Sequence, residues 1–108
     1  MATSYFVLGQ SAPLAATLTP LFTATTDTVC SSIVVCNRSA TATTFRVAVQ
    51  PASVGISNEH YIYYDVTIPG NDTFIATIGI TLEFGDEVSV YNTLATLSFN
   101  LYGSEITP

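Results

Sequence analysis

His60 is the only histidine in the sequence, and histidine is the usual acid–base residue at neutral pH. It follows Glu59 and lies near Asp65, so a serine–histidine–aspartate arrangement can be imagined, but no nucleophile-elbow pattern is present. Cys30 and Cys36 could join His60 on a zinc ion, yet no two of the three are closely spaced, as paired zinc ligands are. We therefore expect no catalytic residue and no metal site among them.

Three acids, Glu83, Asp86 and Glu87, gather around Gly85. Carboxylates in a loop could bind calcium, which takes about six to eight oxygen ligands. Their spacing is not that of a calcium-binding loop, so the sequence predicts a solvated acidic turn. We expect a protein that is not an enzyme and that needs no cofactor.

Cys30 and Cys36 are the only cysteines, and both lie in one predicted strand, residues 28–37. Strand geometry separates their Cα atoms by about 20 Å, whereas a disulfide needs less than about 7 Å. We expect two reduced, buried thiols of the kind found in a reducing compartment. Their even spacing predicts that both face the same side of the strand.

Positive charge is almost absent from the sequence. Arg38 and Arg46 are the only cations, against eight Asp and Glu, which gives a net charge of −6. Binding to nucleic acid or to an anionic membrane needs Lys and Arg, so both partners are excluded. No apolar run approaches the roughly 20 residues of a membrane span. With 9% charged residues and 48% hydrophobic ones, the chain is suited to packing against other proteins.

Short runs of β-branched and aromatic residues, separated by turn residues, predict strands rather than helices. Eight are expected, at residues 5–10, 17–24, 28–37, 43–50, 60–66, 73–80, 87–92 and 97–102. Their spacing predicts a single all-β domain, an antiparallel β-sandwich of about eight strands with jelly-roll or immunoglobulin-like topology. Pro13 and Pro20 interrupt residues 1–27, which we expect to form edge strands and an extended N-terminal arm beside a sandwich core at 28–108.

Alternation along each strand predicts its faces. The predicted core side chains are Phe45, Val47, Val49, Val88, Val90, Leu97, Phe99 and Leu101. In the fifth strand, Tyr61, Tyr63 and Asp65 should share one face, opposite Ile62, Tyr64 and Val66. The short segment 37–40 joins two strong strands and is short enough for a hairpin.

Outward-facing tyrosines and one arginine are the candidate interface residues. They are Arg46, Tyr61, Tyr63, Tyr91 and Tyr102. Tyrosine and arginine are typical of protein interfaces, and exposed tyrosines also line sugar-binding surfaces. The alternative is that these tyrosines lie at the edge of the core with their hydroxyl groups hydrogen-bonded.

Several runs in this chain resemble small structural proteins of tailed bacteriophages. They are Ser31–Ser39, Phe45–Val49, His60–Asp65, Ile68–Thr73, Gly79–Leu82 with Gly85-Asp86, and Leu97–Gly103. These are packing and turn motifs, so the resemblance carries over no functional residues. It implies a virion component, either a capsid decoration (cement) protein or a subunit of the neck, tail or baseplate, made in the bacterial host cytoplasm.

We therefore expect a non-enzymatic virion structural protein whose partners are other virion proteins and copies of itself. The alternative is a receptor- or carbohydrate-binding β-sandwich module of a phage fibre or surface appendage, with a host-surface glycan as its partner. Exposed aromatics beside Asn and Asp favour this alternative, and the absence of tryptophan counts against it.

Overall fold

β-branched and aromatic residues fit a pleated, half-buried surface, and the computed structural model is built almost wholly from strands. It describes residues 2–52 and 54–107. That part of the chain holds eight strands and one turn of 3-10 helix, η1 (Asn58–His60). The strands are β1 (Ala2–Ser11), β2 (Thr19–Thr23), β3 (Asp27–Asn37), β4 (Thr43–Gln50), β5 (Tyr61–Ile68), β6 (Thr73–Leu82), β7 (Glu87–Asn92) and β8 (Leu97–Thr107). The predicted all-β fold is confirmed.

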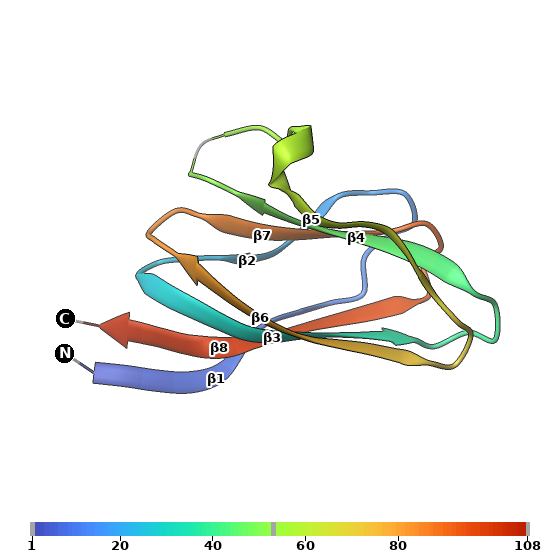
Figure 1. The fold of residues 1–108 in the computed structure, drawn as a ribbon, viewed down its shortest axis with the longest axis horizontal. Helices are drawn as coiled ribbons and strands as arrows, with labels where there is room; N and C mark the ends of the chain where they lie inside the picture. Colours follow the sequence, from blue (N-terminus) through green and yellow to red (C-terminus); the bar gives the residue numbers. More distant parts are fainter. Residues whose placement is uncertain (1, 53, 108) are drawn as a thin grey trace.

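The strands form two four-stranded antiparallel sheets that lie face to face (Figure 1). One sheet has the order β1-β8-β3-β6 and the other the order β2-β7-β4-β5. The first strand pairs with the eighth, the second with the seventh, the third with the sixth and the fourth with the fifth. This is the pattern of a long hairpin rolled up on itself, which is the jelly-roll sandwich. Of the two topologies expected, the jelly roll is therefore the one present.

The predicted hairpin at residues 37–40 is wrong, because β3 and β4 belong to different sheets. Both strands carry an apolar face, and the chain crosses between the layers so that these faces meet. The crossing is held by Asn37, whose buried Nδ2 donates to the carbonyl oxygens of Thr41 (2.9 Å) and Pro69 (3.2 Å). One buried amide thus joins this connection to the β5–β6 turn.

The core lies between the two sheets and contains the side chains that alternation predicted. Phe45 on β4 is its centre, with ring centroids 5.1 Å from Phe74 and 6.2 Å from Phe99. The largest fully buried apolar side chains are Phe45, Phe99, Ile33, Ile68, Leu97, Leu101, Val35, Val47, Val88 and Val90. Burial of this apolar surface is the main favourable term for the fold.

The two cysteines do not face the same side of β3. The pairing of β3 with both neighbouring strands shifts between Cys30 and Ser32. Relative to β8, Ser31 is an extra residue, and it reverses the alternation. Cys30 is fully buried in the core, whereas Cys36 is half-buried on the outer face. Both are free thiols.

Residues 2–23 supply one edge strand to each sheet, β1 and β2. Leu8, Leu21 and Phe22 from this segment pack on the core. In Figure 1 the chain ends lie together at one end of the sandwich, where β1 and β8 run side by side.

Candidate functional site

The guanidinium of Arg46 lies between two tyrosine rings on the outer face of the β2-β7-β4-β5 sheet. Arg46 and Tyr91 are directly opposed across β4 and β7. The Arg46 Cζ atom lies 4.4 Å from the ring centroid of Tyr91 and 4.2 Å from that of Tyr64 on β5. These are cation–π distances on both sides of one cation.

An extra residue in β5 completes this arrangement. Phe45 pairs with Val66 and Val47 pairs with Tyr63, so Arg46, which lies between Phe45 and Val47, faces both Tyr64 and Asp65. Asp65 takes a left-handed backbone conformation with φ of 51°, as the residue at a bulge can.

The Asp65 carboxylate makes a two-point contact with Arg46. The Arg46 Nε donates to Asp65 Oδ1 at 2.6 Å, and Nη2 donates to Oδ2 at 3.3 Å. This hydrogen bond raises the pKa of Arg46, so the guanidinium stays charged. Both side chains remain partly exposed, at 23% for Arg46 and 44% for Asp65, so water screens their attraction.

We call this surface the arginine–tyrosine cluster. Its members are Arg46, Tyr61, Tyr64, Asp65 and Tyr91. The Tyr61 and Tyr64 rings meet edge to face with centroids 5.0 Å apart. Together with Asn58 of η1 they line an open depression of about 410 Å³. Tyr64 is 57% exposed, so the cluster presents an aromatic face to solvent.

Three of the five predicted interface residues lie together in this cluster, and two do not. Arg46, Tyr61 and Tyr91 are in it. Tyr63 instead faces the core, where its ring lies 5.4 Å from Phe74 and 6.3 Å from Phe45. The expectation that it shares a face with Tyr61 and Asp65 is wrong, because the pairing of β5 with β4 shifts on both sides of Tyr63 and each shift breaks the alternation. Tyr102 lies on β8 in the other sheet, opposite Val7 and Ser32.

Sequence reasoning assigned Tyr64 to the apolar face and did not place Asp65 beside Arg46. The sequence contains one signal of this arrangement, which is Asp65 itself. Aspartate tolerates positive φ better than most residues and is uncommon inside strands. An aspartate within a run of tyrosine and β-branched residues indicates a bulge, and a bulge moves the neighbouring side chains to the opposite face.

The residues considered for catalysis or zinc binding are dispersed. His60 is buried, and its Nδ1 accepts a hydrogen bond from the Ser57 backbone N–H at 3.1 Å. Burial raises the pKa of the Cys30 thiol to about 11, so this cysteine is the neutral thiol at physiological pH. Across residues 2–52 and 54–107, no three His, Cys, Asp or Glu side chains are grouped so that they could hold a metal ion.

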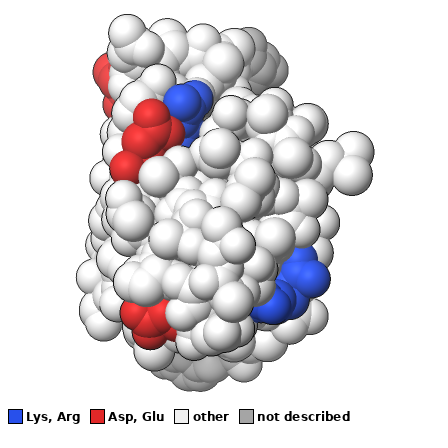
Figure 2. Space-filling view, turned by 90° about the vertical axis from the view of Figure 1, so that its right-hand side faces the viewer, with Lys and Arg blue, Asp and Glu red and all other residues white. Residues whose placement is uncertain are grey.

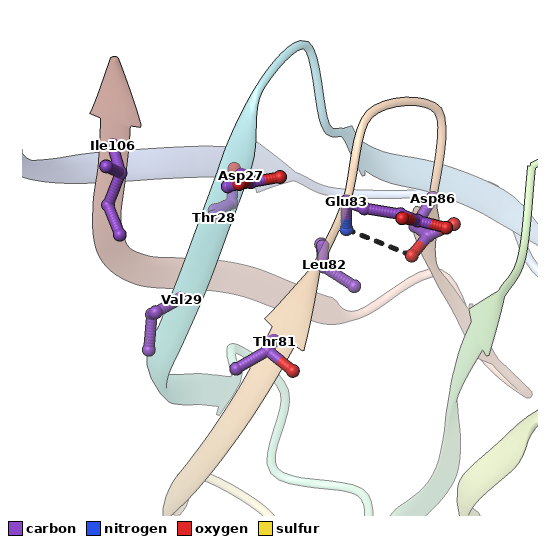
Figure 3. Close-up of a pocket in the computed structure, with 8 residues that line it drawn as sticks. All are labelled: Asp27, Thr28, Val29, Thr81, Leu82, Glu83, Asp86 and Ile106. Atoms are coloured by element: carbon purple, nitrogen blue, oxygen red, sulfur yellow. Dashed lines mark hydrogen bonds between the residues drawn. The ribbon is translucent and has the colours of Figure 1, made fainter. Parts of the chain in front are cut away.

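Acidic side chains line a second depression, of about 460 Å³, between the start of β3, the end of β6 and the β6–β7 turn (Figure 3). Asp27, Glu83 and Asp86 contribute carboxylates to it. The Asp86 carboxylate is already engaged, because it accepts the backbone N–H groups of Glu83 (3.1 Å) and Ala52 (3.2 Å). This carboxylate therefore stabilises the turn around Gly85, whose φ of 92° requires glycine.

Charged side chains form only small, separate patches on the end of the sandwich that Figure 2 presents. Most of that surface is uncharged, in keeping with a chain that has two cations and eight acids. Within the described ranges, no helix has the length and apolar character to cross a membrane.

Fold and surface together define the class: a small jelly-roll β-sandwich with an exposed arginine–tyrosine cluster on one sheet. No protein-family model, no curated protein and no solved structure matches this chain.

Proposed function

We propose that this chain is a non-enzymatic structural protein of a tailed-bacteriophage virion, present in multiple copies on the capsid or on the neck, tail or baseplate. Its partners are other virion proteins and copies of itself, and it is made in the host cytoplasm. The observation that carries the proposal is the arginine–tyrosine cluster, a preordered contact surface on a body that has little surface charge.

The composition of the cluster is that of an interface centre. Tyrosine and arginine, together with tryptophan, are enriched among the residues that dominate binding energy. Arg46 is already fixed by Tyr64, Tyr91 and Asp65, so little side-chain entropy is lost when a partner binds. A partner that covers the two rings would also remove water from the ion pair and strengthen it.

The jelly-roll topology also supports the proposal. This fold recurs in viral capsid proteins and in lectins, where broad outer surfaces and loops make the contacts. A fold by itself does not define a function, so the assignment depends on the cluster.

The test is complementation of a phage that lacks the gene. The chain, or a variant, is supplied in trans, and its copies per particle are measured by quantitative mass spectrometry of gradient-purified virions. We expect the wild-type chain to be incorporated and Arg46→Ala to lose about tenfold or more in occupancy at limiting expression. Arg38→Ala removes the other cation, which lies exposed at the β3–β4 connection, and should be incorporated normally.

Absence of the wild-type chain from purified particles would overturn the virion assignment. Equal incorporation of the Arg46→Ala and Arg38→Ala chains would overturn the role of the cluster. Far-UV circular dichroism and thermal unfolding of each purified variant establish that the compared chains are folded.

A second candidate function is glycan binding, which the depression beside Asn58, Tyr61 and Tyr64 favours. Aromatic faces stack on sugar rings and an amide can bind their hydroxyl groups. A glycan array probed with the purified chain tests it: selective binding that Tyr64→Ala abolishes supports this function, and a flat profile excludes it.

A further inference from the structure

The outer edge of β1 is open along a segment that is apolar and uncharged. In the described part of the chain, β8 is the strand that pairs with β1, and β1 ends its sheet. Residues 2–11 contain no charged side chain. In monomeric proteins, edge strands usually carry charges, proline or bulges that prevent a further strand from pairing with them.

The first half of β1 is exposed on both of its faces. Tyr5 is 82% exposed, and Phe6 and Val7 are each 43% exposed. Phe6 points towards the inner side of the sheet, opposite Gly103, which offers no side chain to cover it. Three consecutive apolar side chains therefore contribute little to the core of a single molecule.

The other sheet edges carry blocking features. On β2, Pro20 lies at a shift in register, and on β5 Asp65 forms the bulge described above. On β6, the inner-facing residues are already packed on the core, and Gly79 with φ of 57° lies where the pairing with β3 shifts. On β1 the shift in register comes after Val7, so residues 2–7 form a straight, unblocked edge.

We propose that a second copy of this chain pairs antiparallel with the β1 edge about a two-fold axis. The two β1-β8-β3-β6 sheets then form one continuous eight-stranded sheet, and Tyr5, Phe6 and Val7 of each copy cover those of the other. An edge strand that pairs antiparallel about a two-fold axis presents the same surface to both copies, as a two-fold interface requires.

The charge distribution favours a second copy as the occupant. Each copy carries a net charge of −6, yet β1 itself is neutral, so the two strands meet without like-charge repulsion. Glu105 lies on β8, opposite Ser4 and one strand away from the edge. In the dimer the two β8 strands are three strand spacings apart, about 14 Å, which exceeds the Debye length of about 8 Å at physiological salt.

The interface is small, so the dimer is reversible. A single strand pair with three apolar side chains from each copy buries less than the roughly 1,200 Å² of a stable complex. This contact concerns copy-to-copy association in solution and does not depend on whether the chain is a virion protein or a glycan-binding module.

Sedimentation velocity of the full-length chain, from about 10 µM to about 1 mM, tests the proposal in the range where small interfaces associate. We expect a monomer at the low end and a dimer at the high end. Tyr5→Lys should weaken the association by about tenfold or more, because it removes an exposed ring from the contact and puts a charge on each of the two paired edge strands. Ile75→Lys makes the same change in charge on the β6 edge of the same sheet, at a residue that is 69% exposed, and should leave association unchanged.

Cysteine crosslinking gives a second measurement of the same contact. In a Cys36→Ser background, Tyr5→Cys, Phe6→Cys and Val7→Cys are oxidised one at a time, with Ile75→Cys as the control. A residue that lies opposite its own copy across the axis forms a disulfide-linked dimer, and the control does not. A chain that stays monomeric at about 1 mM, or a dimer that forms equally well with Tyr5→Lys, overturns the proposal.

Discussion

Asp65 reaches Arg46 by way of its own backbone: its φ of 51° places the carboxylate 2.6 Å from the guanidinium of its neighbour on β4. If Asp65 had regular strand geometry, β5 would contain no extra residue at this point, and only one of its residues would lie opposite Arg46. The bulge therefore places both the ion pair and the Tyr64 ring that stacks on it.

This geometry predicts that Asp65→Gly is more stable than Asp65→Ala, which reverses the usual order of these two substitutions in a strand. Both Asp65→Ala and Asp65→Gly remove the ion pair, which is partly exposed and contributes about 0.2–1 kcal/mol. Alanine must also adopt positive φ, at a cost of about 1–2 kcal/mol, whereas glycine adopts it freely. Asp65→Gly should thus be the more stable variant by urea unfolding, although glycine normally weakens strands. A more stable Asp65→Ala would contradict the bulge.

Tyr63 and Tyr64 are adjacent in sequence, and we expect opposite consequences when each is truncated. Tyr63 packs against Phe45 and Phe74, so Tyr63→Ala should lower the free energy of unfolding by about 3 kcal/mol. Tyr64 is mostly exposed, so Tyr64→Ala should cost less than about 1 kcal/mol and affect partner binding instead. Chemical denaturation of both variants measures the difference, and equal costs would contradict the assigned faces.

Gly103 on β8 cannot carry a side chain. A Cβ atom there would overlap with the backbone oxygen of Val29 on the neighbouring strand, where neither backbone can move easily. Gly103→Ala should therefore destabilise the protein by about 2–4 kcal/mol. Gly55 has nothing within 4 Å of its Cβ position, so Gly55→Ala is the matched control and should be nearly neutral in thermal unfolding.

The buried thiol of Cys30 predicts a loss of stability at alkaline pH. Burial raises its pKa from the ordinary value of 9.0 to about 11. The unfolded chain releases this proton first, so the stabilisation is fully present below pH about 9 and is lost as pH rises towards about 11, by about 3 kcal/mol in all.

The control for this pH dependence is Cys30→Ala, which lacks the titrating group. All other ionisable groups are shared by the two chains, so the informative quantity is the difference between the two chains in urea unfolding at a series of pH values. A difference that stays constant from pH 8 to pH 11 would contradict the burial of the thiol.

Local alternation predicted the faces of β4, β7 and β8 because the β4–β7 pairing runs without a shift from Phe45 to Gln50, and residues 97–102 of β8 pair with β3 without a shift. It failed in β3, where Ser31 is an extra residue relative to β8, and in β5, whose pairing with β4 shifts on both sides of Tyr63. Each extra residue moves the following side chains to the other face. A one-residue bulge leaves little trace in a run of β-forming residues, so the arginine–tyrosine cluster could be predicted only in part.

The sequence also could not predict whether the topology is that of a jelly roll or of an immunoglobulin-like sandwich. That choice depends on which strands pair across the whole chain, such as Ala2 with Thr107, and no local pattern encodes it. Apolar alternation predicts that two faces must meet but leaves the partner of each strand open.

The place of β8 in its sheet has a consequence for how the protein is made. β8 is the last of the eight strands in chain order, yet it lies between β1 and β3, both of which hydrogen-bond to it. On the ribosome, β1 and β3 are synthesised first and must wait with open edges until residues 97–107 emerge. Such long-range pairing folds slowly, so we expect this domain to complete its fold only after the last strand has left the exit tunnel.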